Sequence, residues 1–196
     1  DISKVNAISD VPEYSFEKAV GLSCVDGKNL RSVIYYGPYW SSDAKYPVIV
    51  IRTLDNKDKW IALMDPVSGS LKIINHEHDD AWIGVPWWIE LEENVKWLPS
   101  NKKIWFLSEE TGFNHIYTID VSSGKKEQIT SGDYEIFDPF VSKDGKFWYY
   151  ISNEKDKGER HFYRMDVKTG KKEIIIALPG SNQIFMSPDE KNIAVL

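Results

Sequence analysis

Acyl transfer would require a nucleophile set in a tight turn, a histidine base and a carboxylate to orient it. The nearest approach to a nucleophile turn is Gly21-Leu-Ser-Cys-Val25, which lacks the second glycine that lets a helix pack behind the serine. This segment falls in a predicted strand ahead of Asp26-Gly27, so we interpret Ser23 as an ordinary strand residue. The chain is therefore predicted to contain no catalytic residue and to be inactive by itself.

Two histidines, His115 and His161, are the other residues that a search for a catalytic triad would select. They occupy the same position in successive repeats, at the start of a predicted strand. A side chain that recurs at one repeat position indicates an architectural role, because a single active site needs only one base.

A third candidate is the polar segment His76-Glu-His78-Asp-Asp80. Residues two apart in a strand face the same side, so His76 and His78 could share a metal ion with a carboxylate nearby. Two imidazoles without a third fixed ligand are a weak signal, and the favoured interpretation is a polar strand end. We predict no metal site and no cofactor.

Composition narrows the classes of function. The formal net charge is −6, and Lys and Arg are scattered through predicted turns, so nucleic acid is not an expected partner. No run of 18 apolar residues occurs, which predicts no membrane-spanning helix, and the chain does not open on a signal peptide. The single cysteine, Cys24, excludes an internal disulfide and a cysteine-based zinc site. An aromatic content of 13 % favours strands over helices.

The elements that must position these residues recur along the chain. Three segments each contain an alternating strand, an Asp-x-x-x-Gly turn and a further strand that begins near a lysine; they start at Trp60, His115 and His161. Glycine at the last turn position supplies the positive φ that such a hairpin loop needs, and the Asp side chain can bond the loop backbone. These segments predict strands C and D of a repeating sheet.

A second pattern lies between them and predicts strands A and B. An aromatic residue precedes a polar residue by four positions, and a lysine follows two residues later; the aromatic residues are Tyr39, Trp97, Phe140 and Phe185. They are 58, 43 and 45 residues apart. A period of about 40 to 50 residues built from four short strands is typical of β-propeller blades.

The chain is therefore predicted to be an all-β propeller fragment of four-stranded antiparallel blades. The expected parts are a C–D half-blade (1–36), a blade with an insertion at 79–94 (37–80), two further blades (95–138 and 139–183), and strands A and B of another blade (184–196). The open edges would close within the chain, by pairing of its two half-blades, or between two copies in a homodimer.

The ordered motifs from Asp80 to Leu196 are more specific than a generic blade. They are Trp82-Ile-Gly, Trp97-Leu-Pro-Ser-Asn, Leu107-Ser-Glu-Glu-Thr-Gly-Phe-Asn-His-Ile-Tyr117, Ile129-Thr-Ser-Gly-Asp-Tyr-Glu135 and Tyr149-Tyr-Ile-Ser-Asn-Glu154. This sequence resembles the later propeller blades of the dipeptidyl peptidase IV branch of the prolyl oligopeptidase family of serine peptidases.

The resemblance implies a parent enzyme that is periplasmic or extracellular and carries a C-terminal α/β-hydrolase domain with the Ser-Asp-His triad. The propeller of such enzymes gates and positions peptide substrates, so the hydrolase domain and a peptide are the implied partners. In this family a pair of adjacent glutamates binds the amino end of the peptide. Neither Glu92-Glu93 nor Glu109-Glu110 matches that motif, so the pair is expected upstream of this chain.

The insertion is the best remaining candidate for substrate contact. In the resembling peptidases the loop after the Trp-Val/Ile-Gly stretch approaches the substrate, which implies substrate-binding roles for Trp87, Trp88 and Glu90, beside Val85 and Pro86. Packing between blades is the alternative role of the two tryptophans. The alternative function is a stand-alone propeller that binds protein or glycan partners through a surface of Trp87, Trp88 and Trp105.

Overall fold

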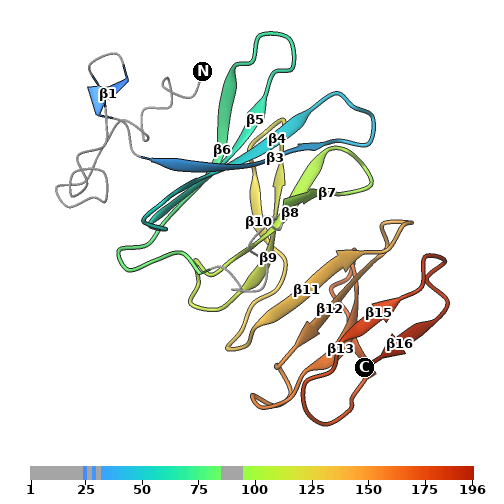
Figure 1. Ribbon diagram of the computed structural model, residues 1–196. Coiled ribbons are helices and arrows are strands. Elements are labelled where there is room, and N and C mark those ends of the chain that lie inside the picture. The colour runs from blue at the N-terminus through green and yellow to red at the C-terminus, as the bar shows by residue number, and fades with distance from the viewer. Residues whose placement is uncertain (1–23, 26–27, 30–31, 85–94) are drawn as a thin grey trace. The chain divides into compact units, whose positions relative to one another are not determined.

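The computed structural model describes residues 24–25, 28–29, 32–84 and 95–196, and every regular element in these ranges is a β-strand (Figure 1). The chain divides into two compact units: the first runs to Trp97 and includes Asp120–Lys125, and the second consists of Leu98–Ile119 and Lys126–Leu196. Within the described ranges, no helix is long and apolar enough to cross a membrane.

The largest sheet of the first unit is a four-stranded antiparallel meander. Its strands, in order, are β3 (Val33–Trp40), β4 (Pro47–Thr53), β5 (Asp58–Met64) and β6 (Leu71–His78). Alternation along β4 and β5 places Ile51 and Trp60 on one face, where Val33, Ile49 and Ile73 pack against them. The short hairpin of β1 (Cys24–Val25) and β2 (Lys28–Asn29) precedes this sheet.

Two further four-stranded sheets follow the same plan. The strands of one are β7 (Val95–Trp97), β8 (Lys103–Ser108), β9 (His115–Asp120) and β10 (Lys126–Gln128); those of the other are β11 (Ile136–Val141), β12 (Phe147–Ser152), β13 (His161–Asp166) and β14 (Lys172–Ile176). A hairpin of β15 (Ile184–Met186) and β16 (Ile193–Val195) ends the chain. The predicted fold class, four-stranded antiparallel propeller blades, is confirmed.

In the second unit, sheet β11–β14 is covered on both faces. On one face, Trp148 meets Trp105 edge to face, with ring centroids 5.5 Å apart and an interplanar angle of 89°. On the other, Tyr149 and Phe162 stack at 5.8 Å and pack against Ile184, Met186 and Ile193 of the final hairpin. Successive sheets thus bury aromatic rows between them, which is how propeller blades share a core.

The first strand of a blade begins earlier than predicted in two places. Residues 33–36 were assigned to an N-terminal strand D, but they belong to β3, and Ile136 already lies in β11. The predicted boundaries, after residues 36 and 138, lie close to Pro38 and Pro139 and fall inside these strands. The structure instead absorbs each proline in a β-bulge, between Tyr36 and Tyr39 and between Phe137 and Phe140, and the strand continues through it.

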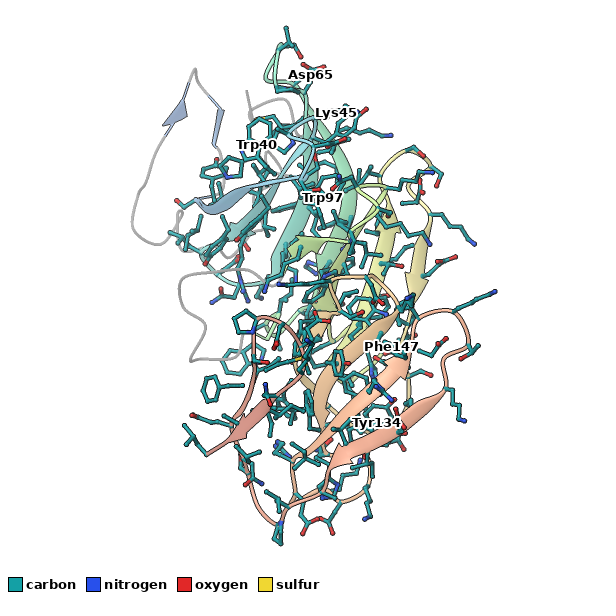
Figure 2. The ribbon with its side chains drawn as sticks, turned by 90° about the vertical axis from the view of Figure 1, so that its right-hand side faces the viewer. Trp40, Lys45, Asp65, Trp97, Tyr134 and Phe147 are labelled. Carbon is teal, nitrogen blue, oxygen red and sulfur yellow. The ribbon has the colours of Figure 1, made fainter. Side chains whose placement is uncertain are left out.

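The hairpin turns between the third and fourth strands have the predicted chemistry. Asp65 lies at the tip of the β5–β6 hairpin (Figure 2), where its carboxylate accepts hydrogen bonds from the backbone N–H groups of Val67 and Ser68 at 2.8 Å. The N–H of Gly69 donates to the Asp65 carbonyl, with Gly69 at φ +67°. Hydrogen bonding lowers the pKa of Asp65, most through Ser68, and the pKa values of Asp120 and Asp166 are lowered in the same way.

The turns between the first and second strands contain a serine that the sequence pattern did not include. Ser142 donates its hydroxyl to Asp144 at 2.7 Å and accepts the backbone N–H groups of Lys146 and Phe147. The hydrogen bond from Ser142 is the largest cause that lowers the pKa of Asp144, to about 2. The same serine-to-aspartate bond recurs at Ser41 and at Ser187.

Candidate functional site at the insertion end of the first sheet

The polar residues of the first unit gather where β5 begins and β6 ends, at the base of the insertion. The backbone register places Asp58 directly opposite His78, Lys59 opposite Glu77, and Trp60 opposite His76. Because side chains alternate along each strand, these pairs lie on the two faces of the sheet in turn. We call Asp58, His76 and His78 the histidine cluster; Lys59 and Glu77 lie on the opposite face.

In the histidine cluster, two imidazole rings meet at one carboxylate oxygen. Oδ1 of Asp58 lies 2.7 Å from Nε2 of His76 and 2.9 Å from Nδ1 of His78. The other nitrogen of His78, Nε2, lies 3.2 Å from Oδ1 of Asp80. The hydrogen bonds with Asp58, and then with Asp80, raise the pKa of His78 above its ordinary value.

Buried residues of the same sheet contact the histidine cluster and fix its position. The Asp58 side chain is only 6 % exposed, whereas those of His76 and His78 are 42 % and 51 % exposed. The His76 ring stacks on the buried Trp60 indole, with centroids 5.0 Å apart and planes 5° from parallel. The backbone N–H of Asp58 donates to the hydroxyl of Thr53 at 3.1 Å. A buried carboxylate thus presents two half-exposed imidazoles to solvent.

The opposite face of the same strands contains a buried ion pair. Nζ of Lys59 lies 3.1 Å from Oε2 of Glu77, and both side chains are more than nine-tenths buried. The Asn75 side-chain amide donates to Oε1 of Glu77 at 3.0 Å, so both carboxylate oxygens have a partner. Removing one member of a buried pair of this kind destabilises the fold, because the other member is left as an uncompensated charge.

The base of the insertion is tied to this sheet by three further contacts. The N–H of Asp79 donates to the Lys57 carbonyl at 3.0 Å, and the N–H of Ile83 donates to the Asn56 carbonyl at 2.7 Å. The buried guanidinium of Arg52 donates through Nη2 to the Ile83 carbonyl. The first residues of the insertion are therefore held against the turn between β4 and β5.

The described residues contain no group of three or more His, Cys, Asp or Glu side chains spaced to hold a metal ion. In the histidine cluster, hydrogen bonds of 2.7 and 2.9 Å bring the ligand atoms closer together than the ~3.3 Å that separates two ligands of a tetrahedral zinc ion with bonds of about 2.0–2.1 Å. The expected pairing of His76 and His78 on one face is present. Asp58 was not in the predicted set.

The predicted substrate-binding residues, and several candidates that the sequence analysis considered and set aside, fall outside the described residues. Trp87, Trp88 and Glu90, together with Val85, Pro86 and Glu92-Glu93, lie in 85–94, and Ser23 lies in 1–23. Glu109 and Glu110 are exposed, and Glu110 accepts a hydrogen bond from Nζ of Lys126 at 2.5 Å. Their predicted position in an exposed loop agrees with the structure.

The prediction that Trp105 belongs to a binding surface is wrong. The Trp105 side chain is 2 % exposed and lies in the core against Trp148. Its position in β8 gave no indication of which strand face would be covered, because propeller sheets are buried on both faces. Trp82, in contrast, is 72 % exposed.

His115 has the architectural contacts that its repeat position suggested. Nε2 of the ring lies 2.9 Å from the Gly132 carbonyl, and Nδ1 lies 3.1 Å from the Thr130 hydroxyl. A carbonyl can only accept, so Nε2 carries a proton and donates it to the Gly132 carbonyl. The ring also meets Tyr134 edge to face at 5.1 Å. Both ring nitrogens therefore have hydrogen-bond partners within the fold.

Asp58 and Arg52 are the site residues that sequence reasoning missed. Asp58 and Lys59 open an otherwise apolar strand, and simple counting from the pair Met64–Leu71 would place Asp58 opposite Glu77. The register shift between Ile61 and Ala62 moves it opposite His78, so the sequence alone did not reveal the cluster. Arg52 is a single cation that follows the apolar run Val48–Ile51. Nothing in that pattern indicated that its side chain donates a hydrogen bond to the Ile83 carbonyl.

Comparisons with known proteins agree with this architecture. The profile of the family described as "Dipeptidyl peptidase IV (DPP IV) N-terminal region" matches residues 18–195. No curated protein sequence matches the chain.

Three solved structures resemble it. The dipeptidyl peptidase 4 of Porphyromonas gingivalis has a TM-score of 0.65 and 22 % identity over 78 % of this chain and 21 % of that protein. A candidate dipeptidyl aminopeptidase IV from Bacteroides ovatus has a TM-score of 0.67 and 13 % identity, over 90 % of this chain and 27 % of that one. TolB from Acinetobacter baumannii has a TM-score of 0.57 and 23 % identity, over 83 % of this chain and 37 % of that one. At these identities the likeness concerns the fold, and the chain spans well under half of each structure.

Proposed function

Because the chain belongs to the dipeptidyl peptidase IV N-terminal region family, we propose that it is a non-catalytic propeller segment that gates and positions peptide substrates for a serine-peptidase hydrolase domain. The observation that carries the proposal is the family match over residues 18–195, on a chain whose described sheets are propeller blades. The periplasm or the extracellular space is the proposed location, in keeping with exopeptidases of this kind.

The proposed role assigns substrate contact to the insertion and rigidity to the sheet. The bonds from Ile83 to Asn56 and from Arg52 to Ile83 fix where the insertion leaves the sheet. A loop that enters from a fixed base loses less entropy on meeting a ligand than a free one does. Trp87, Trp88 and Glu90 are proposed to meet the peptide, with the indoles covering its apolar side chains and the carboxylate accepting hydrogen bonds from its backbone.

The test uses the full-length enzyme that contains this chain. Trp88→Ala should lower kcat/KM for dipeptide-releasing substrates about tenfold, which corresponds to ~1.4 kcal/mol of lost transition-state binding. Labelling of the hydrolase serine by a small fluorophosphonate should be unchanged, since that reagent does not need the propeller to position it. Asp65→Asn, in the β5–β6 turn at the opposite end of β5 from the base of the insertion, is the control.

Unchanged kcat/KM in Trp88→Ala, on both short and long peptides, would count against substrate contact. The chain alone should not turn over a Gly-Pro chromogenic substrate, and turnover by the pure chain would overturn its non-catalytic assignment. A monodisperse monomer in light scattering would remove the homodimer, one of the two alternatives for closing the open blade edges.

A further inference from the structure

We propose that His78 is a pH-sensitive tether: as an imidazolium it joins Asp80, in the base of the insertion, to the buried Asp58 of the sheet, and it releases Asp80 when the ring loses a proton. Nδ1 of His78 lies 2.9 Å from Oδ1 of Asp58, and Nε2 lies 3.2 Å from Oδ1 of Asp80. One ring therefore connects the start of β5 with the first residues after β6. This inference concerns the chain's own fold and does not rest on the proposed peptide-binding role.

The two carboxylates determine the protonation state of the His78 ring. An ionised carboxylate accepts hydrogen bonds and donates none, so each ring nitrogen that bonds a carboxylate must carry a proton. A neutral imidazole has a single N–H, so only the imidazolium can bond Asp58 and Asp80 at the same time. The hydrogen bond with Asp58, and then that with Asp80, raise the pKa of His78 above its ordinary value of 6.5. The charged ring is therefore the form that this arrangement stabilises.

Loss of the proton should break the bond with Asp80 and keep the bond with Asp58. The Asp58 side chain is only 6 % exposed, so water cannot readily replace the ring there. The Asp80 side chain is fully exposed, and an exposed ion pair is worth little because water replaces it. The neutral ring would therefore keep its proton on Nδ1 and turn the lone pair of Nε2 towards the Asp80 carboxylate, which repels it.

The other charged groups at this end of the sheet leave the titration to His78. His76 needs only its Nε2 proton to bond Asp58, and a neutral ring supplies that proton. In the β4–β5 turn, the Asp55 carboxylate accepts the backbone N–H of Lys57. The charged side chains on the opposite face of these strands are Arg52, Lys59 and Glu77, as their register requires.

The rest of the insertion base is held by bonds that do not involve an imidazole. The N–H of Asp79 donates to the Lys57 carbonyl at 3.0 Å. The Asp79 carboxylate accepts the backbone N–H groups of Ala81 and Trp82 at 2.8 and 2.9 Å. Asp80 lies between these fixed residues, and its bond with His78 is the contact that depends on the proton. Release should therefore change Asp80 and its neighbours and leave the sheet intact.

The tether should be closed at low pH and open at high pH. Because the pKa of His78 in the folded chain lies above its unfolded value, the stability that the tether contributes is complete below pH 6.5. It is lost as the pH rises through the folded pKa. The base of the insertion, beside the proposed site of peptide contact, would thus respond to pH near neutrality.

An NMR titration of the chain between about pH 5 and pH 9 tests the proposal. We expect the His78 ring to titrate above pH 6.5, and the backbone amide signals of Asp80, Ala81 and Trp82 to follow the same curve. Asp80→Asn, a change at an exposed position, should lower the pKa of His78 part of the way towards its ordinary value. Asp65→Asn, in the β5–β6 turn at the opposite end of β5, is the control and should leave that pKa unchanged.

His78→Gln removes the titrating group and keeps a donor for Asp58. In this variant, with its fold verified by circular dichroism, the amide signals of residues 80–82 should no longer change over the same pH range. A His78 pKa at or below 6.5 in the parent chain would overturn the proposal. So would an unchanged His78 pKa in Asp80→Asn, or amide signals that titrate as before in folded His78→Gln.

Discussion

Gly132 occupies a position where a single added methyl group should destabilise the second unit strongly. Its φ of +134° lies in the range that favours glycine, and its carbonyl accepts a hydrogen bond from His115. A Cβ atom at this position would lie 2.6 Å from Cε1 and 2.9 Å from Cδ1 of Tyr134. Those distances are below any van der Waals contact, and the Tyr134 ring is buried in the core cluster.

Two costs add for Gly132→Ala. Holding a non-glycine residue at this φ costs about 1–3 kcal/mol. Displacing the buried Tyr134 ring, which also packs edge to face on His115, costs about 1–3 kcal/mol more. Alanine narrows the unfolded ensemble and returns about 0.4–1 kcal/mol. We therefore expect the free energy of unfolding to fall by roughly 1–6 kcal/mol.

The matched control is Gly170→Ala, in a hairpin turn of the same unit. Gly170 also has a positive φ, +69°, but an added Cβ would meet no atom within 4 Å. This variant should lose only about 1 kcal/mol, because backbone strain is its one cost. The difference between the two variants isolates the clash with Tyr134.

Urea unfolding followed by circular dichroism measures both values. With an m-value of about 2 kcal/mol/M, a difference of ~2 kcal/mol corresponds to a gap of ~1 M between the midpoints of the two variants. Equal midpoints for Gly132→Ala and Gly170→Ala would refute the steric argument. Greater stability of Gly132→Ala than of the parent chain would also refute the strain argument.

Four other substitutions test the core and the turns. Lys59→Met should lower the free energy of unfolding by about 3–5 kcal/mol, because it leaves the Glu77 carboxylate buried without its cation. Urea unfolding should show that the double variant Lys59→Met/Glu77→Leu recovers part of that loss. Trp105→Ala should cost about 3–5 kcal/mol by the same assay, and a loss below 0.5 kcal/mol would contradict its burial. Ser142→Ala should raise the pKa of Asp144 from about 2 towards its ordinary value in an NMR titration. The lowered pKa of Asp144 stabilises the folded chain at pH values above the pKa that Asp144 has in the unfolded chain, and this stabilisation is lost as the pH falls towards 2. The parent chain should therefore lose more stability than Ser142→Ala between pH 5 and pH 2.

Most of the fold was predictable because propeller blades are built from local hairpins. An Asp-x-x-x-Gly turn such as Asp65–Gly69 forms from the chemistry of its own residues, and strict alternation beside it identifies the strands. The repetition of these signals at blade spacing predicts the four-stranded sheets without knowledge of any long-range contact. The earlier start of β3 was missed because a β-bulge is a property of the paired ladder, and a single strand does not reveal it.

The candidate site depended on information that the linear sequence contains only implicitly. The sequence determined the repeating strands, their turns and the pairing of His76 and His78 on one strand face. Tertiary structure decided that Asp58 lies between the two rings, that Lys59 and Glu77 are buried on the other face, and that Trp105 belongs to the core. The physical reason is that a strand's periodicity specifies which side chains share a face, whereas cross-strand register and the packing of the next sheet decide what that face meets.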